Sequence, residues 1–157
     1  MQGNPTYMQM AIDLAVENVT SGAGGPFGAI IVRAGQVIAT GVNRVTANHD
    51  PTAHAEVQAI RAACAQLADF QLPGCIIYTS CEPCPMCLAA IYWARCEAIF
   101  FGCTATDAAD AGFDDSFLYD EVKKPHVDRT IPTGQLLGPE AMATFNAWRT
   151  FESRIGY

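Results

Sequence analysis

Residues 78–95 read "YTSCEPCPMCLAAIYWAR" and lead from a short apolar strand, through a turn with three cysteines, into a helix. Pro85 suits the first position of that helix, where a backbone N–H would have no partner in any case. We therefore expect Cys84 and Cys87, a C-x-x-C pair, to share one face of its first turn. A helix N-terminus favours the thiolate over the thiol, and the thiolate is the form that binds metal.

A second motif lies upstream in residues 50–60, "DPTAHAEVQAI", where His54 and Glu56 stand two positions apart. On a regular helix, positions two apart point about 200° away from each other. Both side chains can therefore reach one site only from the first turn of a helix. One histidine and two cysteine thiolates suit Zn²⁺ and leave a fourth position open for water, whose pKa zinc can lower to about 7. Glu56 would then not be a ligand and could take a proton from that water.

The same stretch allows a closed metal site. Cys81, Cys84 and Cys87 form C-x-x-C-x-x-C, and with His54 they would complete a structural Cys₃His site. The chain would then be a zinc-stabilised structural or binding protein, and Glu56 would have no evident purpose. The spacing alone leaves both the open and the closed site as alternatives.

Hydrophobic periodicity predicts the element order α-β-β-α-β-α-β followed by further helix. The expected elements are a helix over 5–20, a hairpin over 27–43 turning at Ala34-Gly35, a helix over 55–68 capped by Asp50 or Thr52, a strand over 75–80, a helix from Pro85, a strand over 98–104, a short strand over 133–138 and a helix over 139–155. A hairpin followed by βαβ crossovers indicates a single domain, residues 1–157. We expect a three-layer α/β/α sandwich with a mixed sheet of about five strands.

The composition favours a globular protein that acts on a small molecule. Half of the residues are hydrophobic and 16% are charged, which excludes the disordered class. No apolar run approaches the roughly 20 residues of a membrane span, and the start "MQGNPTYMQM" lacks the pattern of a signal peptide. We therefore expect a cytoplasmic protein with mostly reduced cysteines. A net charge of −7 with scattered Lys and Arg argues against a nucleic-acid partner.

H-x-E at 54–56 with P-C-x-x-C at 83–87 is the signature of the zinc nucleobase deaminases. Beyond this motif, nearly the whole chain resembles the bacterial guanine deaminases of the cytidine deaminase superfamily. The stretches that carry the resemblance are "GGPFGAIIV" (24–32), "DPTAHAEVQAIR" (50–61), the cysteine stretch 78–95, "TDAADAGFDDSF" (106–117) and "FNAWRTFESRIGY" (145–157). The motif is specific for the superfamily, whereas "GFDDSF" and the aromatic C-terminus favour guanine.

The resemblance implies a hydrolase that acts on a C–N bond of a cyclic amidine and converts guanine to xanthine and ammonia. It implies Zn²⁺ as the cofactor, held by His54, Cys84 and Cys87. It also implies that Glu56 shuttles protons. The backbone amides of Ala55 and Cys84 are expected to help hold the water or the ring.

The resemblance further implies that Phe27 and Trp93 pack against the base and that Asn43 hydrogen-bonds to it. As alternatives, the two aromatic residues suit a core and Asn43 suits a turn. Guanine presents an N1–H and a 2-amino group, and one carboxylate can accept from both. Asp114 and Asp115 are candidates, with Asp115 expected to be a second proton-handling group. A helix N-cap followed by a first-turn acid is the alternative for this pair.

The C-terminal helix carries an apolar stripe that must be buried somewhere, made up of Met142, Phe145, Trp148, Phe151 and Ile155. A terminal element after a segment rich in Pro and Gly is suited to exchange between subunits. We therefore expect a homodimer with this helix at the subunit boundary. Tyr157 is expected to close an active site and so to contact the substrate.

Two related activities share the zinc motif. A tRNA adenosine deaminase would need a basic face for the anticodon arm, and this acidic chain offers only Arg149 and Arg154 on its last helix. A cytosine deaminase, or an enzyme for small triazine amines, would use the same attack by water. The substrate class therefore depends on the resemblance and not on the motif.

Overall fold

The computed structural model describes residues 2–156, and these divide after residue 116 into two compact units. The first unit contains α1 (Pro5–Thr20), β1 (Gly28–Arg33), β2 (Gln36–Val42), α2 (Val45–Asn48), α3 (Ala55–Leu67), β3 (Cys75–Cys81), α4 (Pro85–Trp93), β4 (Ala98–Cys103) and α5 (Ala105–Asp110). Helix α6 (Ser116–Lys123) begins at the boundary, and the second unit continues with a 3₁₀ turn, η1 (His126–Asp128), and α7 (Gly138–Thr150). None of the described helices is both long and apolar enough to cross a membrane.

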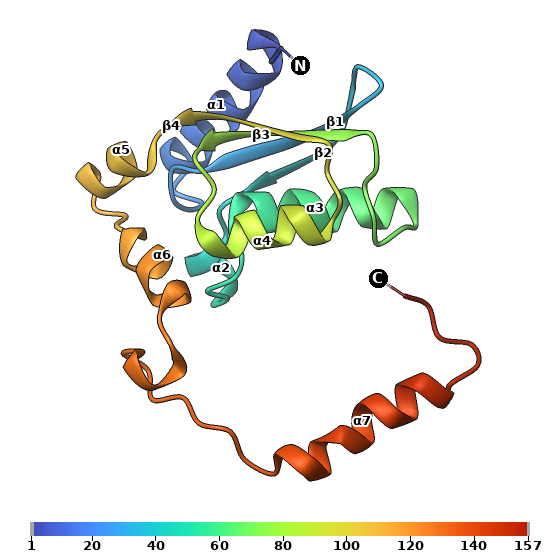
Figure 1. Ribbon diagram of the computed structural model, residues 1–157. Helices are drawn as coiled ribbons and strands as arrows, with labels where there is room; N and C mark the ends of the chain where they lie inside the picture. Colours follow the sequence, from blue (N-terminus) through green and yellow to red (C-terminus); the bar gives the residue numbers. More distant parts are fainter. Residues whose placement is uncertain (1, 157) are drawn as a thin grey trace. The chain divides into compact units, whose positions relative to one another are not determined.

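The sheet has four strands in the order β2-β1-β3-β4 (Figure 1). Strand β1 pairs antiparallel with both β2 and β3, and β3 pairs parallel with β4. The expected mixed sheet is therefore confirmed. The prediction of a further strand over 133–138 is wrong, because those residues form no strand and lie in the second unit.

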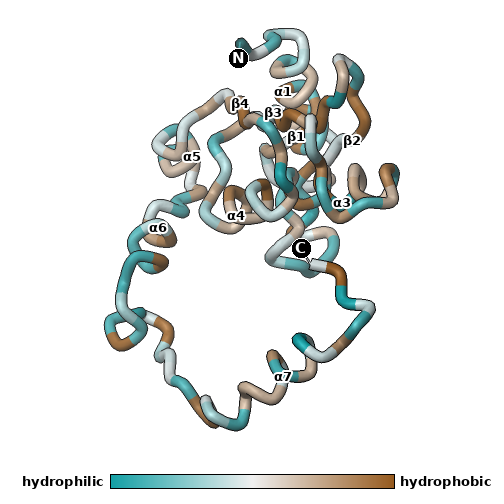
Figure 2. Tube along the Cα trace, turned by 45° about the vertical axis from the view of Figure 1, so that its right-hand side comes forward, coloured by the Kyte–Doolittle hydropathy of each residue, from teal (hydrophilic) through white to brown (hydrophobic). Residues whose placement is uncertain are grey.

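The two faces of the sheet are covered by different helices. On β1, Ile30 and Val32 belong to a core cluster with Ala11 of α1, whereas Ile31 belongs to a second cluster with Ala59 of α3. Alternate residues of a strand point to opposite faces, so α1 covers one face, and α3 with α4 covers the other (Figure 1). The α/β/α sandwich is confirmed, and Figure 2 shows hydrophobic colours along its central strands.

Helix α3 lies directly against β2. A Cβ atom added at Gly41 would lie 2.2 Å from the carbonyl oxygen of Ala55 and 2.4 Å from the amide nitrogen of Ala59. Only glycine permits so close an approach between a strand and a helix backbone. Gly41 thereby fixes where the first turn of α3, which carries Glu56, lies relative to the sheet.

The expected hairpin is confirmed, with Ala34 and Gly35 at φ 48° and 74° in its turn. Two positive φ angles are typical of a type I′ turn, which matches the twist of the paired strands. The predicted bounds 139–155 of the last helix are wrong at the C-terminal end, since α7 ends at Thr150. Its apolar residues are exposed on the second unit; they are Met142, Phe145, Trp148, Phe151 and Ile155.

Candidate metal centre and catalytic pocket

The candidate site begins at two helix N-termini. His54 is the N-cap residue of α3 and Cys84 is the N-cap residue of α4, and neither side chain caps its own helix. Asp50 and Thr52, the predicted caps of α3, form a turn instead, in which the Thr52 N–H donates to the Asp50 carboxylate at 2.8 Å. Because neither side chain is used as a helix cap, the His54 imidazole and the Cys84 thiol are free to interact with each other.

Three ligand atoms gather between these termini. The Nδ1 atom of His54 lies 3.7 Å from the Sγ atom of Cys84 and 3.5 Å from that of Cys87. Zn–N bonds of about 2.05 Å and Zn–S bonds of about 2.3 Å at tetrahedral angles would separate such atoms by roughly 3.6 Å. The side chains therefore already have the spacing of a zinc site. Among the described residues, they form the only cluster of this kind, and Cys81 is not part of it.

The three groups alter one another's pKa values. The Cys87 thiol donates to Cys84, and this bond, with a further contribution from His54, lowers the pKa of Cys84 to about 4. The same contact, together with burial, raises the pKa of Cys87. The hydrogen bond with Cys84 raises the pKa of His54. A metal ion bound by these groups would displace their protons, because metal ligands must be deprotonated.

Cys81 differs from the other two cysteines of its stretch. It is the last residue of β3, and its thiol donates to the carbonyl oxygen of Thr104 at 3.6 Å. Burial raises the pKa of Cys81 to about 11, so it stays a thiol at neutral pH. The geometry therefore supports the open three-ligand site and not the closed Cys₃His site.

Glu56 is the second residue of α3, and only 6% of its surface is exposed. Burial, and after it the charge of Cys84, raises the pKa of its carboxyl group. Its side chain lines the same cavity as His54 and Cys84. A buried carboxylate beside an open metal position is placed to accept a proton from a water and to pass it on.

This cavity has a volume of about 660 Å³, within the usual range for small-molecule sites. Most of the residues that the sequence nominated line it, namely Phe27, Asn43, His54, Glu56, Cys84, Asp114 and Asp115. Cys87 lies behind the wall and is fully buried. Ala55, also fully buried, is the first residue of α3 and does not line the cavity.

Trp93, a predicted substrate contact, does not line the cavity. Trp93 is the last residue of α4, is 60% exposed, and has the guanidinium of Arg95 5.8 Å from its ring centroid. Tyr157 lies outside the described residues. Their assignment to the substrate stays a prediction.

The two aspartates of "GFDDSF" have different surroundings. A carboxylate oxygen of Asp114 accepts from the backbone N–H of Ser116 at 2.9 Å and from its hydroxyl at 2.5 Å, and these bonds lower the pKa of Asp114. Asp115 has a buried carboxylate oxygen without a partner among the described residues. Burial, and then the charge of Cys84, raises its pKa. Asp114 thus holds the start of α6, while Asp115 keeps an unused acceptor at the cavity.

Several cavity residues were not identified from the sequence. The ring of Phe113 meets that of Phe27 edge to face, with centroids 5.0 Å apart. Glu82 accepts from the Ala105 N–H at 3.0 Å and so ties the end of β3 to α5. Phe113 lies within the quoted "GFDDSF", and Glu82 lies between two motif cysteines, so both could have been nominated by position.

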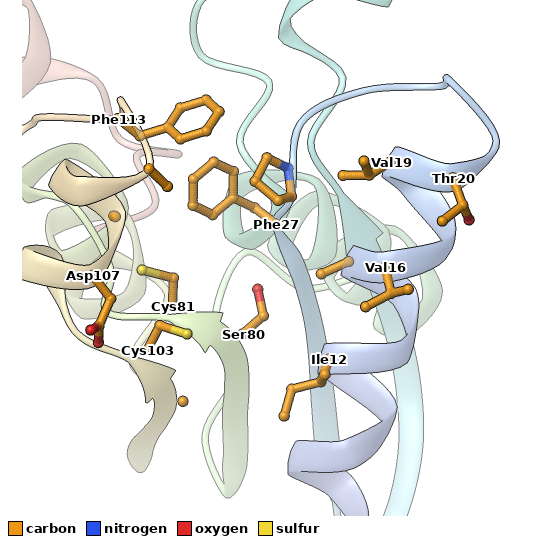
Figure 3. Close-up of a pocket in the computed structure, with 15 residues that line it drawn as sticks. Ile12, Val16, Val19, Thr20, Phe27, Ser80, Cys81, Cys103, Asp107 and Phe113 are labelled. Atoms are coloured by element: carbon orange, nitrogen blue, oxygen red, sulfur yellow. The ribbon is translucent and has the colours of Figure 1, made fainter.

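The Phe27–Phe113 pair also borders a second cavity, of about 510 Å³, which Figure 3 shows between α1 and the β4–α5 segment. Its walls are mainly apolar and include Ile12 and Val16 of α1. Cys81 lines both cavities. The aromatic pair therefore forms a wall common to the catalytic cavity and an apolar one.

Comparison with known proteins agrees with this geometry. Over 152 residues, the chain is 57% identical to guanine deaminase of Bacillus subtilis (strain 168), covering 97% of each chain. The crystal structure of guanine deaminase from Bacillus subtilis superposes with a TM-score of 0.96 at 55% identity over 99% of each chain. A guanine deaminase structure from Nitrosomonas europaea gives a TM-score of 0.68 at 31% identity, covering 73% of this chain and 66% of that one.

A tRNA-specific adenosine deaminase of Agrobacterium fabrum (strain C58 / ATCC 33970) is 47% identical over 77 residues, which cover 49% of this chain and 51% of that protein. The model of the cytidine and deoxycytidylate deaminase zinc-binding region matches residues 1–103. These residues carry both halves of the metal motif. The resemblance inferred from the sequence is confirmed, and the chain belongs to the cytidine and deoxycytidylate deaminase family.

Proposed function

We propose that this chain is a guanine deaminase, which hydrolyses guanine to xanthine and ammonia. The observation that carries the proposal is the extent of the similarity. Likeness to a guanine deaminase runs through the whole chain, whereas likeness to a tRNA-specific adenosine deaminase covers about half of it. The site supports the same chemistry, because an open three-ligand cluster lies beside a buried carboxylate.

We infer that His54, Cys84 and Cys87 hold one zinc ion, which supplies Lewis-acid activation of a water. Attack at C2 of guanine forms a C2–O bond and moves the electrons of the C2=N3 bond to N3. Glu56 takes the proton from the attacking water and delivers it to N3. It then moves the proton of the new hydroxyl group to the 2-amino group, so that ammonia leaves and the C2=O bond of xanthine forms.

The other wall of the cavity would recognise and orient the base. The carboxylate oxygen of Asp115 that lacks a partner is suited to accept from the 2-amino group and to assist its protonation as ammonia. The side-chain N–H groups of Asn43 are suited to donate to a base acceptor. Phe27 and Phe113 would pack against the flat ring.

The protein is also proposed to be a cytoplasmic homodimer with α7 at the subunit boundary. Two apolar surfaces favour a partner. The apolar residues of α7 are exposed, and on α4, which consists of apolar residues throughout, Tyr92 and Trp93 are 70% and 60% exposed. A second copy would cover such surfaces and would allow Trp93 and Tyr157 to reach a substrate.

The metal assignment predicts different effects for three cysteines. Cys84→Ser and Cys87→Ser should each lose bound zinc and at least about 10²-fold in turnover, because a neutral hydroxyl is a poor replacement for a thiolate ligand. The matched change Cys81→Ser should keep both. Elemental analysis and ammonia release measure the two properties. Loss of zinc in Cys81→Ser would restore the closed site.

The substrate proposal is tested by ammonia release from guanine, adenine, cytosine, cytidine and a triazine amine under one set of conditions. Guanine should give the highest kcat/KM, since the cavity offers a carboxylate acceptor to its amino group. A protein that acts only on the nucleoside, or prefers cytosine, would contradict the proposal.

The two aspartates give a matched pair of variants. Asp115→Asn should lower turnover on guanine by about 10²-fold with zinc content unchanged, because it removes a proton-handling group. Asp114→Asn should keep turnover within a few-fold of wild type, since the amide oxygen can still accept from Ser116. The opposite ranking, measured by kcat, would assign the substrate contact to Asp114.

The C-terminal proposal predicts that deletion of residues 156–157 leaves zinc and the dimer intact but lowers kcat/KM for guanine. Deletion of everything after Gly138 removes α7. It should reduce solubility, because the apolar surface that α7 covers in the dimer would then be exposed. Sedimentation gives the oligomeric state, and ammonia release gives the kinetics. Unchanged kinetics after the two-residue deletion would show that Tyr157 does not close the site, and a monomeric wild type would contradict the dimer.

A further inference from the structure

A buried amide lies on the face of α1 that packs against the first unit's core. Helix α1 buries three residues, Ala11, Ala15 and Asn18, and Asn18 is only 3% exposed. A buried amide is costly unless its polar atoms are paired. Its Oδ1 atom has no partner among the described residues, so its hydrogen bonds are made by the NH₂ group alone.

That NH₂ group joins two segments of the catalytic cavity. The Nδ2 atom of Asn18 donates to the carbonyl oxygen of Gly25 at 2.8 Å and to that of Asn43 at 3.0 Å. Both acceptors are carbonyl groups, so the atom that faces them must be the nitrogen. The backbone oxygen of Asn18 also accepts from the N–H groups of Ala23 and Gly24 at 3.0 and 3.2 Å. Asn18 therefore links residues 23–25 and residue 43 to helix α1 through hydrogen bonds.

The contact is close enough to require glycine. A Cβ atom added at Gly24 would lie 2.2 Å from the carbonyl oxygen of Asn43 and 2.8 Å from the Nδ2 atom of Asn18. Gly24, Gly25 and Asn43 all line the catalytic cavity. The segment that carries the glycines is thus held against Asn43 by hydrogen bonds from Asn18, which does not itself line the cavity.

Asn43 is itself oriented by its neighbours. Its backbone N–H donates to the carbonyl oxygen of Phe27 at 3.0 Å, and its Oδ1 atom accepts from the Val45 N–H at 3.3 Å. A backbone N–H can only donate, so the atom facing Val45 is the oxygen. No described residue accepts from the Nδ2 atom of Asn43. The direction of this donor therefore depends on the backbone at position 43.

We propose that Asn18 is a positioning residue, which aims the Asn43 amide and the Gly24–Gly25 backbone at the base without touching the substrate. The metal ligands are held at the first turns of α3 and α4, and the side-chain hydrogen bonds of Asn18 go only to Gly25 and Asn43. A change at Asn18 should therefore alter binding of the base and leave the metal in place. The inference rests on the proposed function for its readout.

A double-mutant cycle tests the proposal, with Asn18→Ala, Asn43→Ala and the double variant. Asn18→Ala should raise KM roughly tenfold, about the effect of one hydrogen bond, with kcat within about twofold and zinc retained. The double variant should have the KM of Asn43→Ala alone, because Asn18 acts through Asn43. Ser21→Ala is the matched control. It removes a nearby bond from the Ser21 hydroxyl to the Asn18 carbonyl and should leave KM unchanged.

A merely structural role would give another result, namely a lower melting temperature with KM unchanged, or KM effects that multiply in the double variant. Either outcome would overturn the proposal. If Asn18→Ala does not fold, Asn18→Ser keeps a small polar side chain too short to reach both carbonyls, and the same cycle applies. The cycle uses the base that wild type deaminates fastest. If guanine is not the substrate, the ammonia-release assay on the wild-type protein will show it. If Asn18 is not a positioning residue, only the double-mutant cycle will show it.

Discussion

The meeting of two helix N-termini is the constraint on which the rest of the site depends. His54 and Cys84 begin α3 and α4 as N-cap residues, yet both side chains turn from their own helices to each other. The positive ends of two helix dipoles therefore surround the thiols and the Glu56 carboxylate. Partial positive charge from both helices favours the thiolates that metal binding requires, and at Glu56 it opposes the burial that raises the pKa of the carboxyl group. Backbone packing, above all at Gly41, fixes the separation of these groups.

A second consequence is the separation of tasks around the cavity. In the proposed mechanism, Glu56 moves protons from the side of α3 and α4, whereas residues 24–27 and Asn43 recognise the base from the other side. The two sides reach the same cavity from different parts of the fold, and α1 supports the second of them through Asn18. Substitutions on the α3 and α4 side should therefore lower mainly kcat, whereas substitutions on the side of Asn43 should raise mainly KM.

The sequence predicted best those features that are set by local geometry. The two-residue spacing of His54 and Glu56 required a first turn, and Pro85 marked the start of α4. Features set by backbone contacts were missed. Asn18 bonds to main-chain carbonyl groups, which leave no side-chain pattern. The large apolar residues Val16 and Val19 of α1 are 56% and 47% exposed, because α1 packs on the sheet through its small residues Ala11 and Ala15. The strand expected over 133–138 does not form, because a strand needs a neighbour to pair with and a short local sequence cannot supply one.

The central claim is that Glu56 moves the protons while the other three side chains hold the metal. Glu56→Gln tests it most directly, because the amide keeps the shape of the side chain and removes only the base. Zinc content and kcat on guanine should be measured on one preparation. The account predicts full zinc occupancy with kcat lower by at least about 10²–10⁴-fold. A zinc-loaded Glu56→Gln protein with near-normal turnover would contradict it.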